Sequence, residues 1–144
     1  MATSQSLFAE GSYSETELKV YLKKAIKIIS IIIIPAIIVT FIFGNYILLA
    51  FGEKYSDEGF ILLKFLSLSG IFVSINAIGS VILNIKHKIK LLILLSLIST
   101  TITLSLSVIL MRMNLFGIIG IGIGWTVGQS IIALIYLLLI KRIL

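Results

Sequence analysis

Few side chains in this sequence are suited to catalysis. His87 is the only histidine, and the chain has no cysteine, so it can form neither a Cys–His pair nor a thiolate metal site. His87 lies between two lysines, and no acidic residue stands near it in the sequence to complete a dyad. We interpret His87 as an ordinary solvated loop residue and predict that the protein is not an enzyme.

Three of the six acidic residues, Glu53, Asp57 and Glu58, lie in the short polar stretch GEKYSDEG at residues 52–59. Carboxylates are good ligands for calcium and magnesium, but these three have no histidine beside them and do not follow the spacing of a known metal-binding loop. We therefore expect an exposed loop here, with no bound metal. Nothing in the chain predicts a cofactor.

Gly120, Gly124 and Gly128 recur every four residues near the end of the chain. They do not predict a nucleotide-binding loop, because no strand precedes them and no Lys-Ser/Thr pair follows. Residues four apart lie on one face of a helix, and glycines on such a face let a second backbone approach closely. We predict helix packing along this face.

Two amides, Asn76 and Gln129, stand near the middle of long apolar runs. An unpaired polar group in hydrocarbon costs free energy unless it faces protein or water. Two roles fit each amide: it lines a hydrated cavity, or it forms a hydrogen bond with a neighbouring helix. These two residues are the candidates for lining a functional cavity.

The elements that must position these residues are apolar helices. The 144 residues are 59% hydrophobic and 12% charged with a mean hydropathy of +1.20, whereas a soluble domain is about half apolar and about a quarter charged. Within residues 28–144, four runs reach the roughly 20 residues needed to cross the hydrocarbon core as a helix. We predict an all-α membrane protein with transmembrane helices at residues 28–51, 60–85, 91–111 and 115–140.

A basic amphipathic helix is expected before the first span, over residues 14–27. Ser14 and Glu17 fit a capping box that starts this helix, and its lysines share one face, so we predict that it lies at the lipid surface. We expect residues 1–13 to hold the end of a preceding helix and a loop. In the first span, Pro35 is the only proline of the chain and predicts a kink.

The net charge of +6 does not predict a nucleic-acid partner, because the basic residues stand in short clusters between apolar runs. Nine of the twelve lie in the amphipathic stretch, the loop after the second span and the C-terminal end. The alternate side has only Lys54, Lys64 and Arg112. The positive-inside rule then places both termini in the cytoplasm, and the expected partner is the lipid bilayer.

Several segments, in this order and spacing, resemble the polysaccharide flippases of the MATE-like (multidrug/oligosaccharidyl-lipid/polysaccharide) exporter superfamily. They are SLFAEGS at residues 6–12, FGEKYSDEG at residues 51–59, the helix end Asn84-Ile85-Lys86, and GIIGIGIGWTVGQ at residues 117–129. Members of that superfamily have about twelve to fourteen helices in two pseudo-symmetric bundles. This chain resembles only their last four helices. A truncated protein, one product of a split gene or a gene fragment would each show such a partial resemblance.

The resemblance implies a protein of the cell membrane that flips lipid-linked oligosaccharide between leaflets for assembly of surface polysaccharide. Its partners would be that lipid and the missing N-terminal helices of the same transporter. Two alternatives remain. A multidrug or cation antiporter of the same fold would be expected to hold an acid inside its bundle, and no Asp or Glu lies within the four predicted spans. The second alternative is a four-helix scaffold protein that does not transport. The upstream reading frame distinguishes it from a flippase, because a flippase would need about eight further helices encoded there.

Overall fold

The computed structural model describes residues 15–113 and 117–143 and contains four long helices in those ranges. They are α2 (Glu15–Leu49), α3 (Glu53–Ile85), α4 (Ile89–Arg112) and α5 (Ile119–Ile143). Each helix contains a segment that is long and apolar enough to cross a membrane, and these segments are Leu22–Leu49, Gly59–Ile85, Ile89–Arg112 and Ile119–Arg142. The described ranges hold no strand. The predicted all-α class with four candidate membrane-spanning helices is confirmed.

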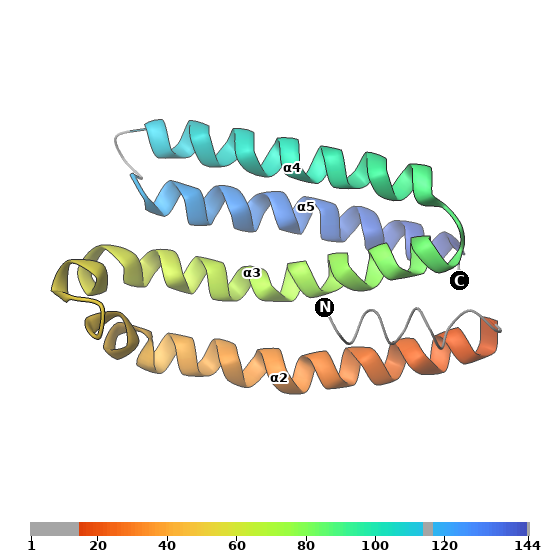
Figure 1. Ribbon diagram of the computed structural model, residues 1–144, viewed down its shortest axis with the longest axis horizontal. Helices are drawn as coiled ribbons and strands as arrows, with labels where there is room; N and C mark the ends of the chain where they lie inside the picture. Colours follow the sequence, from red (N-terminus) through yellow and green to blue (C-terminus); the bar gives the residue numbers. More distant parts are fainter. Residues whose placement is uncertain (1–14, 114–116, 144) are drawn as a thin grey trace.

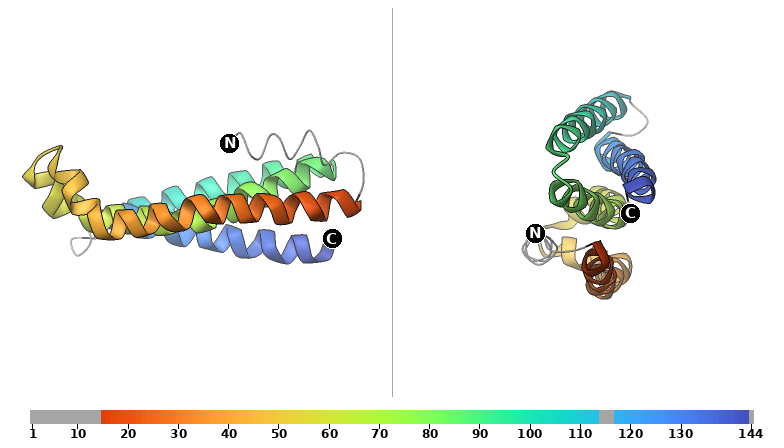
Figure 2. Two further views of the ribbon diagram at one scale, coloured as in Figure 1. Left: turned by 90° about the horizontal axis from the view of Figure 1, so that it is seen from below. Right: turned by 90° about the vertical axis from the view of Figure 1, so that its right-hand side faces the viewer.

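The four helices form a zigzag row in the order α2, α3, α5, α4 (Figures 1 and 2). The backbone of α2 lies beside α3 alone, whereas α5 packs along both α3 and α4. Successive helices run in opposite directions, so the start of α2, the α3–α4 turn and the end of α5 lie at one end of the molecule (Figure 1). We call this end the basic end, because Lys86, Lys88, Lys141 and Arg142 lie there.

The outer faces of the helices are apolar. Ile32 of α2 is 62% exposed, Leu97 of α4 is 63% exposed and Leu138 of α5 is 66% exposed. Soluble proteins rarely expose continuous apolar surfaces of this kind. These faces are suited to contact with lipid.

The buried side chains form two small clusters near the basic end. In the first, Leu22 and Ala25 of α2 pack with Ile82 of α3. The second joins α3, α4 and α5 and consists of Leu83, Leu95, Ile132 and Tyr136. The buried apolar side chains of these clusters therefore gather toward the end at which the α3–α4 turn lies.

The predicted basic helix and first span form one helix. Because no glycine or proline lies near residues 27 and 28, α2 continues from Glu15 to Leu49 without interruption. Pro35 lies inside it, and the kink expected there stays a prediction. Interfacial placement of the basic segment also stays a prediction, and residues 1–13 and Ser14 lie outside the described residues.

The predicted loop at residues 52–59 is wrong. The turn is short, with Gly52 at a positive φ of 122°, and α3 already begins at Glu53. A carboxylate in the first turn interacts favourably with the helix dipole, which favours helix in a stretch whose polar composition suggests a loop. At 33 residues, α3 is about 50 Å long and extends past a hydrocarbon core of about 30 Å.

His87 completes the turn between α3 and α4. Its φ is +55°, the left-handed region, and it follows the C-terminal cap of α3 at Lys86. The amide of His87 donates to the Asn84 carbonyl at 3.0 Å, and the amide of Lys88 donates to the Leu83 carbonyl at 2.8 Å. These two bonds make a Schellman motif, in which glycine is the usual residue at the His87 position. His87 therefore has a conformational role.

Candidate functional site

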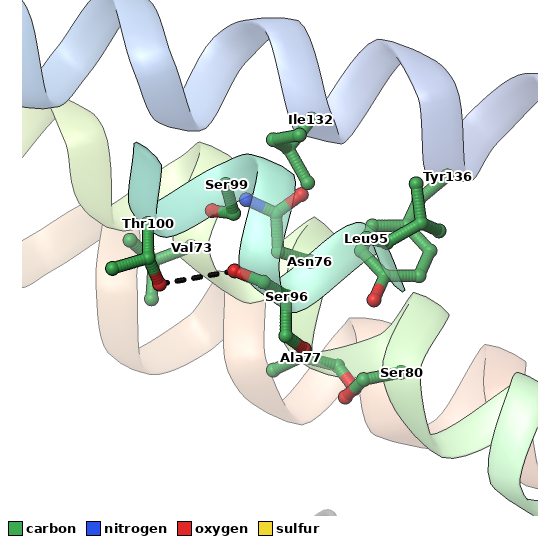
Figure 3. A pocket seen from close by; sticks show the side chains of 10 residues that line it. All are labelled: Val73, Asn76, Ala77, Ser80, Leu95, Ser96, Ser99, Thr100, Ile132 and Tyr136. Carbon is green, nitrogen blue, oxygen red and sulfur yellow. Dashed lines mark hydrogen bonds between the residues drawn. The ribbon is translucent and has the colours of Figure 1, made fainter. Parts of the chain in front are cut away.

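A cavity of about 430 Å³ opens between α3 and α4, with α5 behind it (Figure 3). Six of its ten lining side chains carry a hydroxyl or an amide. The ten residues are Val73, Asn76, Ala77 and Ser80 of α3, Leu95, Ser96, Ser99 and Thr100 of α4, and Ile132 and Tyr136 of α5. They come from the second half of α3 and the first half of α4, so the cavity lies toward the basic end.

Asn76 and Gln129, predicted separately as cavity candidates, are brought together. The Asn76 Nδ2 donates to Gln129 Oε1 at 2.7 Å and lies 3.2 Å from the Gln129 backbone carbonyl. Asn76 lines the cavity, whereas Gln129 supports it from behind and is not among the lining residues. The pair thus combines the two roles that we considered, lining a cavity and forming a hydrogen bond between helices.

The other amide atom of Asn76 has a different environment. Its Oδ1 is buried and accepts no hydrogen bond from the described part of the chain. A buried amide oxygen normally has a partner, because leaving it unpaired costs about 1 to 3 kcal/mol. Since Asn76 lines the cavity, this oxygen is a candidate acceptor for a donor group of a ligand.

The hydroxyls of α4 line the opposite wall. Thr100 Oγ1 donates to the Ser96 carbonyl at 3.0 Å, drawn as the dashed line in Figure 3. Such bonds to the preceding turn use the hydroxyl hydrogen and leave the oxygen lone pairs free to accept. The neighbouring Thr101 forms the same kind of bond, to Leu97, but does not line the cavity.

The predicted packing glycines lie directly against the backbone of α4. A Cβ added to Gly120 would lie 2.6 Å from the Leu110 carbonyl carbon, and one added to Gly124 would lie 2.5 Å from the Ser107 amide nitrogen. At Gly128 the nearest atom would be Thr103 Oγ1, at 2.6 Å. These approaches bring the backbone of α4 against α5 from Thr103 to Leu110.

A second face of α5 contacts α3 and was not predicted. Thr126 Oγ1 lies 3.0 Å from the Phe65 carbonyl and 2.7 Å from the Gly122 carbonyl, so its hydroxyl links the two helices. Gly122 lies against the side chains of Leu62 and Phe65. The positions 122, 126 and 129 are separated by four and three residues, which is the sequence signal for this face.

Tyr136 is the other residue that sequence reasoning missed. It is only 4% exposed, lines the cavity and packs with the second buried cluster. Its ring occupies the space where a side chain on Gly79 would begin. The absence of a side chain at Gly79 therefore lets this aromatic residue reach the wall of the cavity.

Lys64 lies one turn inside the spanning part of α3 and contacts two aromatic rings. Its Nζ is 4.0 Å from the centroid of the Phe60 ring and 5.7 Å from that of Phe41 on α2. Cation–π contacts of this kind stabilise an ammonium group that is partly withdrawn from water. Lys64 thus joins α2 to α3, far from the cavity.

The ten residues that line the cavity include no acidic side chain and no histidine. Within residues 15–113 and 117–143, no three His, Cys, Asp or Glu side chains are grouped as metal ligands. The sequence contains no Asp or Glu within the four spanning segments. The cavity instead offers hydroxyl and amide groups, which bind neutral polar ligands through hydrogen bonds.

Comparison of the chain with protein-family models, with curated proteins and with solved structures finds no match.

Proposed function

We propose that this chain is the C-terminal part of a MATE-like flippase that translocates lipid-linked oligosaccharide for cell-surface polysaccharide assembly. The observation that carries the proposal is the cavity between α3 and α4, which places hydroxyl and amide groups inside membrane-spanning helices. A sugar presents many hydroxyls, each a donor and an acceptor. Ser, Thr, Tyr and Asn side chains complement both functions.

The charge of the spans favours this substrate over a cation. An antiporter that exchanges drugs for cations would be expected to hold an acidic group in its bundle, and these spans contain none. Asn76 Oδ1, buried and without a partner among the described residues, fits a sugar hydroxyl without adding a charge.

The open row of helices is suited to one part of a larger transporter. The cavity is walled by α3, α4 and α5 and is open on its remaining side. In the proposed transporter, the preceding helices of the same protein close that side, and two bundles rock around the shared cavity. The sugar is then shielded from hydrocarbon while the lipid tail stays in the bilayer.

Orientation follows from the clustering of cations. The basic end carries the lysines of α2, those of the α3–α4 turn and the last two basic residues, whereas Arg112 is near the other end. By the positive-inside rule, the basic end faces the cytoplasm of a plasma-membrane protein, and the first turns of α2 lie at that surface as the interfacial segment.

Two neighbouring threonines allow a matched test of the cavity. Thr100 and Thr101 both donate to the carbonyl four residues before them, at 3.0 and 2.9 Å, but only Thr100 lines the cavity. In cells that depend on this chain together with the product of its upstream reading frame, we expect Thr100→Val to lower surface polysaccharide while Thr101→Val does not. Protein levels in the membrane are measured for both.

Equal polysaccharide from the two variants, at equal protein levels, would contradict the role of the cavity. The upstream reading frame tests the wider proposal. It should encode about eight further membrane helices, in frame or as an adjacent gene. A complete, isolated four-helix gene would instead support a scaffold protein.

A further inference from the structure

A second hollow lies on the opposite face of α3 from the polar cavity. The residues of α3 that line the cavity are 73, 76, 77 and 80, whereas those that line this groove are 71, 74, 75, 78 and 82. At 100° per residue, these two sets point in nearly opposite directions. The groove, of about 630 Å³, runs between α2 and α5 over α3.

The groove is apolar apart from Ser30, Ser74 and Lys23, and Lys23 makes one end of it cationic. Its walls include Ile26, Ile29 and Ile33 of α2, Ile75 and Ile78 of α3, and Leu137 of α5. The hydroxyl of Ser74 donates to the Gly70 carbonyl at 2.7 Å, so it does not call for a polar ligand. Lys23 is the one charged residue among those that line the groove.

The length of the groove corresponds to one leaflet of a bilayer. On α2 its lining residues extend from Leu22 to Ile34, which is about 18 Å along the helix axis. Half of the hydrocarbon core is about 15 Å thick. The groove therefore extends from the membrane surface at the basic end to about the midplane.

Further cations gather where the groove meets the basic end. Leu22 and Ala25 pack with Ile82, and Ile140 packs against the same cluster, so the start of α2 lies close to the end of α5. Lys27, one turn after Lys23 on α2, is exposed, as are Lys141 and Arg142, which follow Ile140. The nearest acidic positions in the sequence, Glu15 and Glu17, lie about 9 to 12 Å before Lys23 along the axis of α2.

We propose that this groove binds an anionic phospholipid of the leaflet at the basic end, with an acyl chain along the groove and the phosphate at Lys23 and its basic neighbours. The apolar walls suit an acyl chain, and the cations suit an anionic headgroup. An apolar helix from another polypeptide would fill the groove but would bury Lys23 without a counter-charge. The lipid satisfies both parts of the site, and the inference does not depend on what the polar cavity binds.

Native mass spectrometry of the full chain in detergent tests the proposal. The probes are phosphatidylglycerol and phosphatidylcholine with identical acyl chains, each added at the same concentration. We expect preferential retention of phosphatidylglycerol, and a roughly fivefold loss of that preference in Lys23→Ala. The matched control is Lys90→Ala, which removes an exposed lysine from the start of α4, a helix that does not pack on α2.

A second pair of variants tests the position of the acyl chain. Ser30→Phe fills the groove, whereas Ala36→Phe adds the same ring to an exposed position of α2 that does not line it. Ser30→Phe should reduce retention of both lipids, and Ala36→Phe should leave it unchanged. Circular dichroism checks folding, and if Ser30→Phe does not fold, the two lysine variants decide the matter.

Three results would overturn the proposal. The first is equal retention of the two lipids by the natural chain. The second is equal loss in Lys23→Ala and Lys90→Ala, and the third is a dimer that Ser30→Phe dissociates, which would mean that a second copy occupies the groove.

Discussion

Asn76 and Gln129 are separated by 53 positions in the sequence, yet they meet through a 2.7 Å hydrogen bond between α3 and α5. Each is an amide in an apolar segment, where an unpaired polar group is costly. Their pairing leaves Asn76 with one buried oxygen at the cavity wall. Asn76 thus joins two helices through its Nδ2 atom, while its Oδ1 atom is available to a ligand.

The Asn76–Gln129 bond should be measurable as a coupling energy. Asn76→Leu, Gln129→Leu and the double variant form a cycle whose coupling we expect to be about 0.6 kcal/mol and at most about 1.7 kcal/mol, as for other hydrogen bonds between membrane helices. The measurement is reversible unfolding in mixed detergent micelles. Strictly additive effects would show that the bond does not stabilise the fold.

The packing glycines provide a second residue-scale prediction. A Cβ at Gly124 would lie 2.5 Å from a backbone atom of α4, whereas a Cβ at Gly70 would have no atom within 4 Å. We expect Gly124→Ala to be destabilising. Gly70→Ala should stabilise the helix by about 0.5 to 1 kcal/mol through lower backbone entropy in the unfolded state.

Thermal unfolding of both variants in one detergent checks this difference. Equal midpoints for Gly124→Ala and the natural chain would show that α4 and α5 are not in close contact. Gly124→Leu, which adds a larger side chain at the same place, should be more damaging than Gly124→Ala and should lower expression as well.

At the scale of the elements, α5 has two packing faces of different chemistry. The sequence predicted the face at residues 120, 124 and 128, because three glycines at a spacing of four form a recognisable pattern. The face toward α3 combines Gly122, Thr126 and Gln129, so its pattern is not confined to one residue type. A threonine in a membrane helix usually bonds its own backbone, and its bond to Phe65 depends on which helix is adjacent.

The sequence predicted the helix ends that are set by hydrophobicity. It did not predict those that are set by local backbone energetics. The four spans differ from the predicted ranges by at most six residues at either end. The stretch at residues 52–59 was predicted as a loop from its polar side chains, but a polar sequence can continue a helix beyond the membrane. The cavity itself depends on the order of the helices in the row, which no local sequence pattern encodes.

The turn between α3 and α4 yields an element-scale prediction. His87 has a φ of +55°, a conformation that glycine adopts freely and β-branched residues adopt only with strain. We expect His87→Val to destabilise the protein by about 1 to 2 kcal/mol relative to His87→Gly. Unfolding in mixed micelles gives the order, and a valine variant at least as stable as the glycine variant would contradict the Schellman geometry.

At the scale of the whole molecule, the row of helices is apolar on its outer faces, has a cavity with hydroxyl and amide groups between α3 and α4, and is basic at one end. The four antiparallel helices bring the start of α2, the α3–α4 turn and the end of α5 to that basic end (Figure 1). Positive charge on one end of a membrane protein is the main determinant of its orientation. The helix arrangement therefore places all three cationic segments on the same side of the membrane, as the charge rule requires.

Charge added at the opposite end should disturb this orientation. Glu53→Lys with three further lysines inserted after Gly52 puts four cations at the α2–α3 turn. We expect a measurable fraction of molecules to insert in the reverse orientation, because the difference in positive charge between the two ends becomes small. Unchanged labelling of single-cysteine reporters in this variant would contradict the charge argument.

The most direct test of the account is the side of the membrane on which each turn lies. The natural chain has no cysteine, so Glu53→Cys at the α2–α3 turn and Lys88→Cys at the α3–α4 turn each introduce a single reporter. With a membrane-impermeant maleimide, the account predicts that Glu53→Cys is labelled in intact cells and that Lys88→Cys is labelled only after permeabilisation. Labelling of both positions from the same side, or recovery of the folded chain in buffer without detergent or lipid, would contradict it.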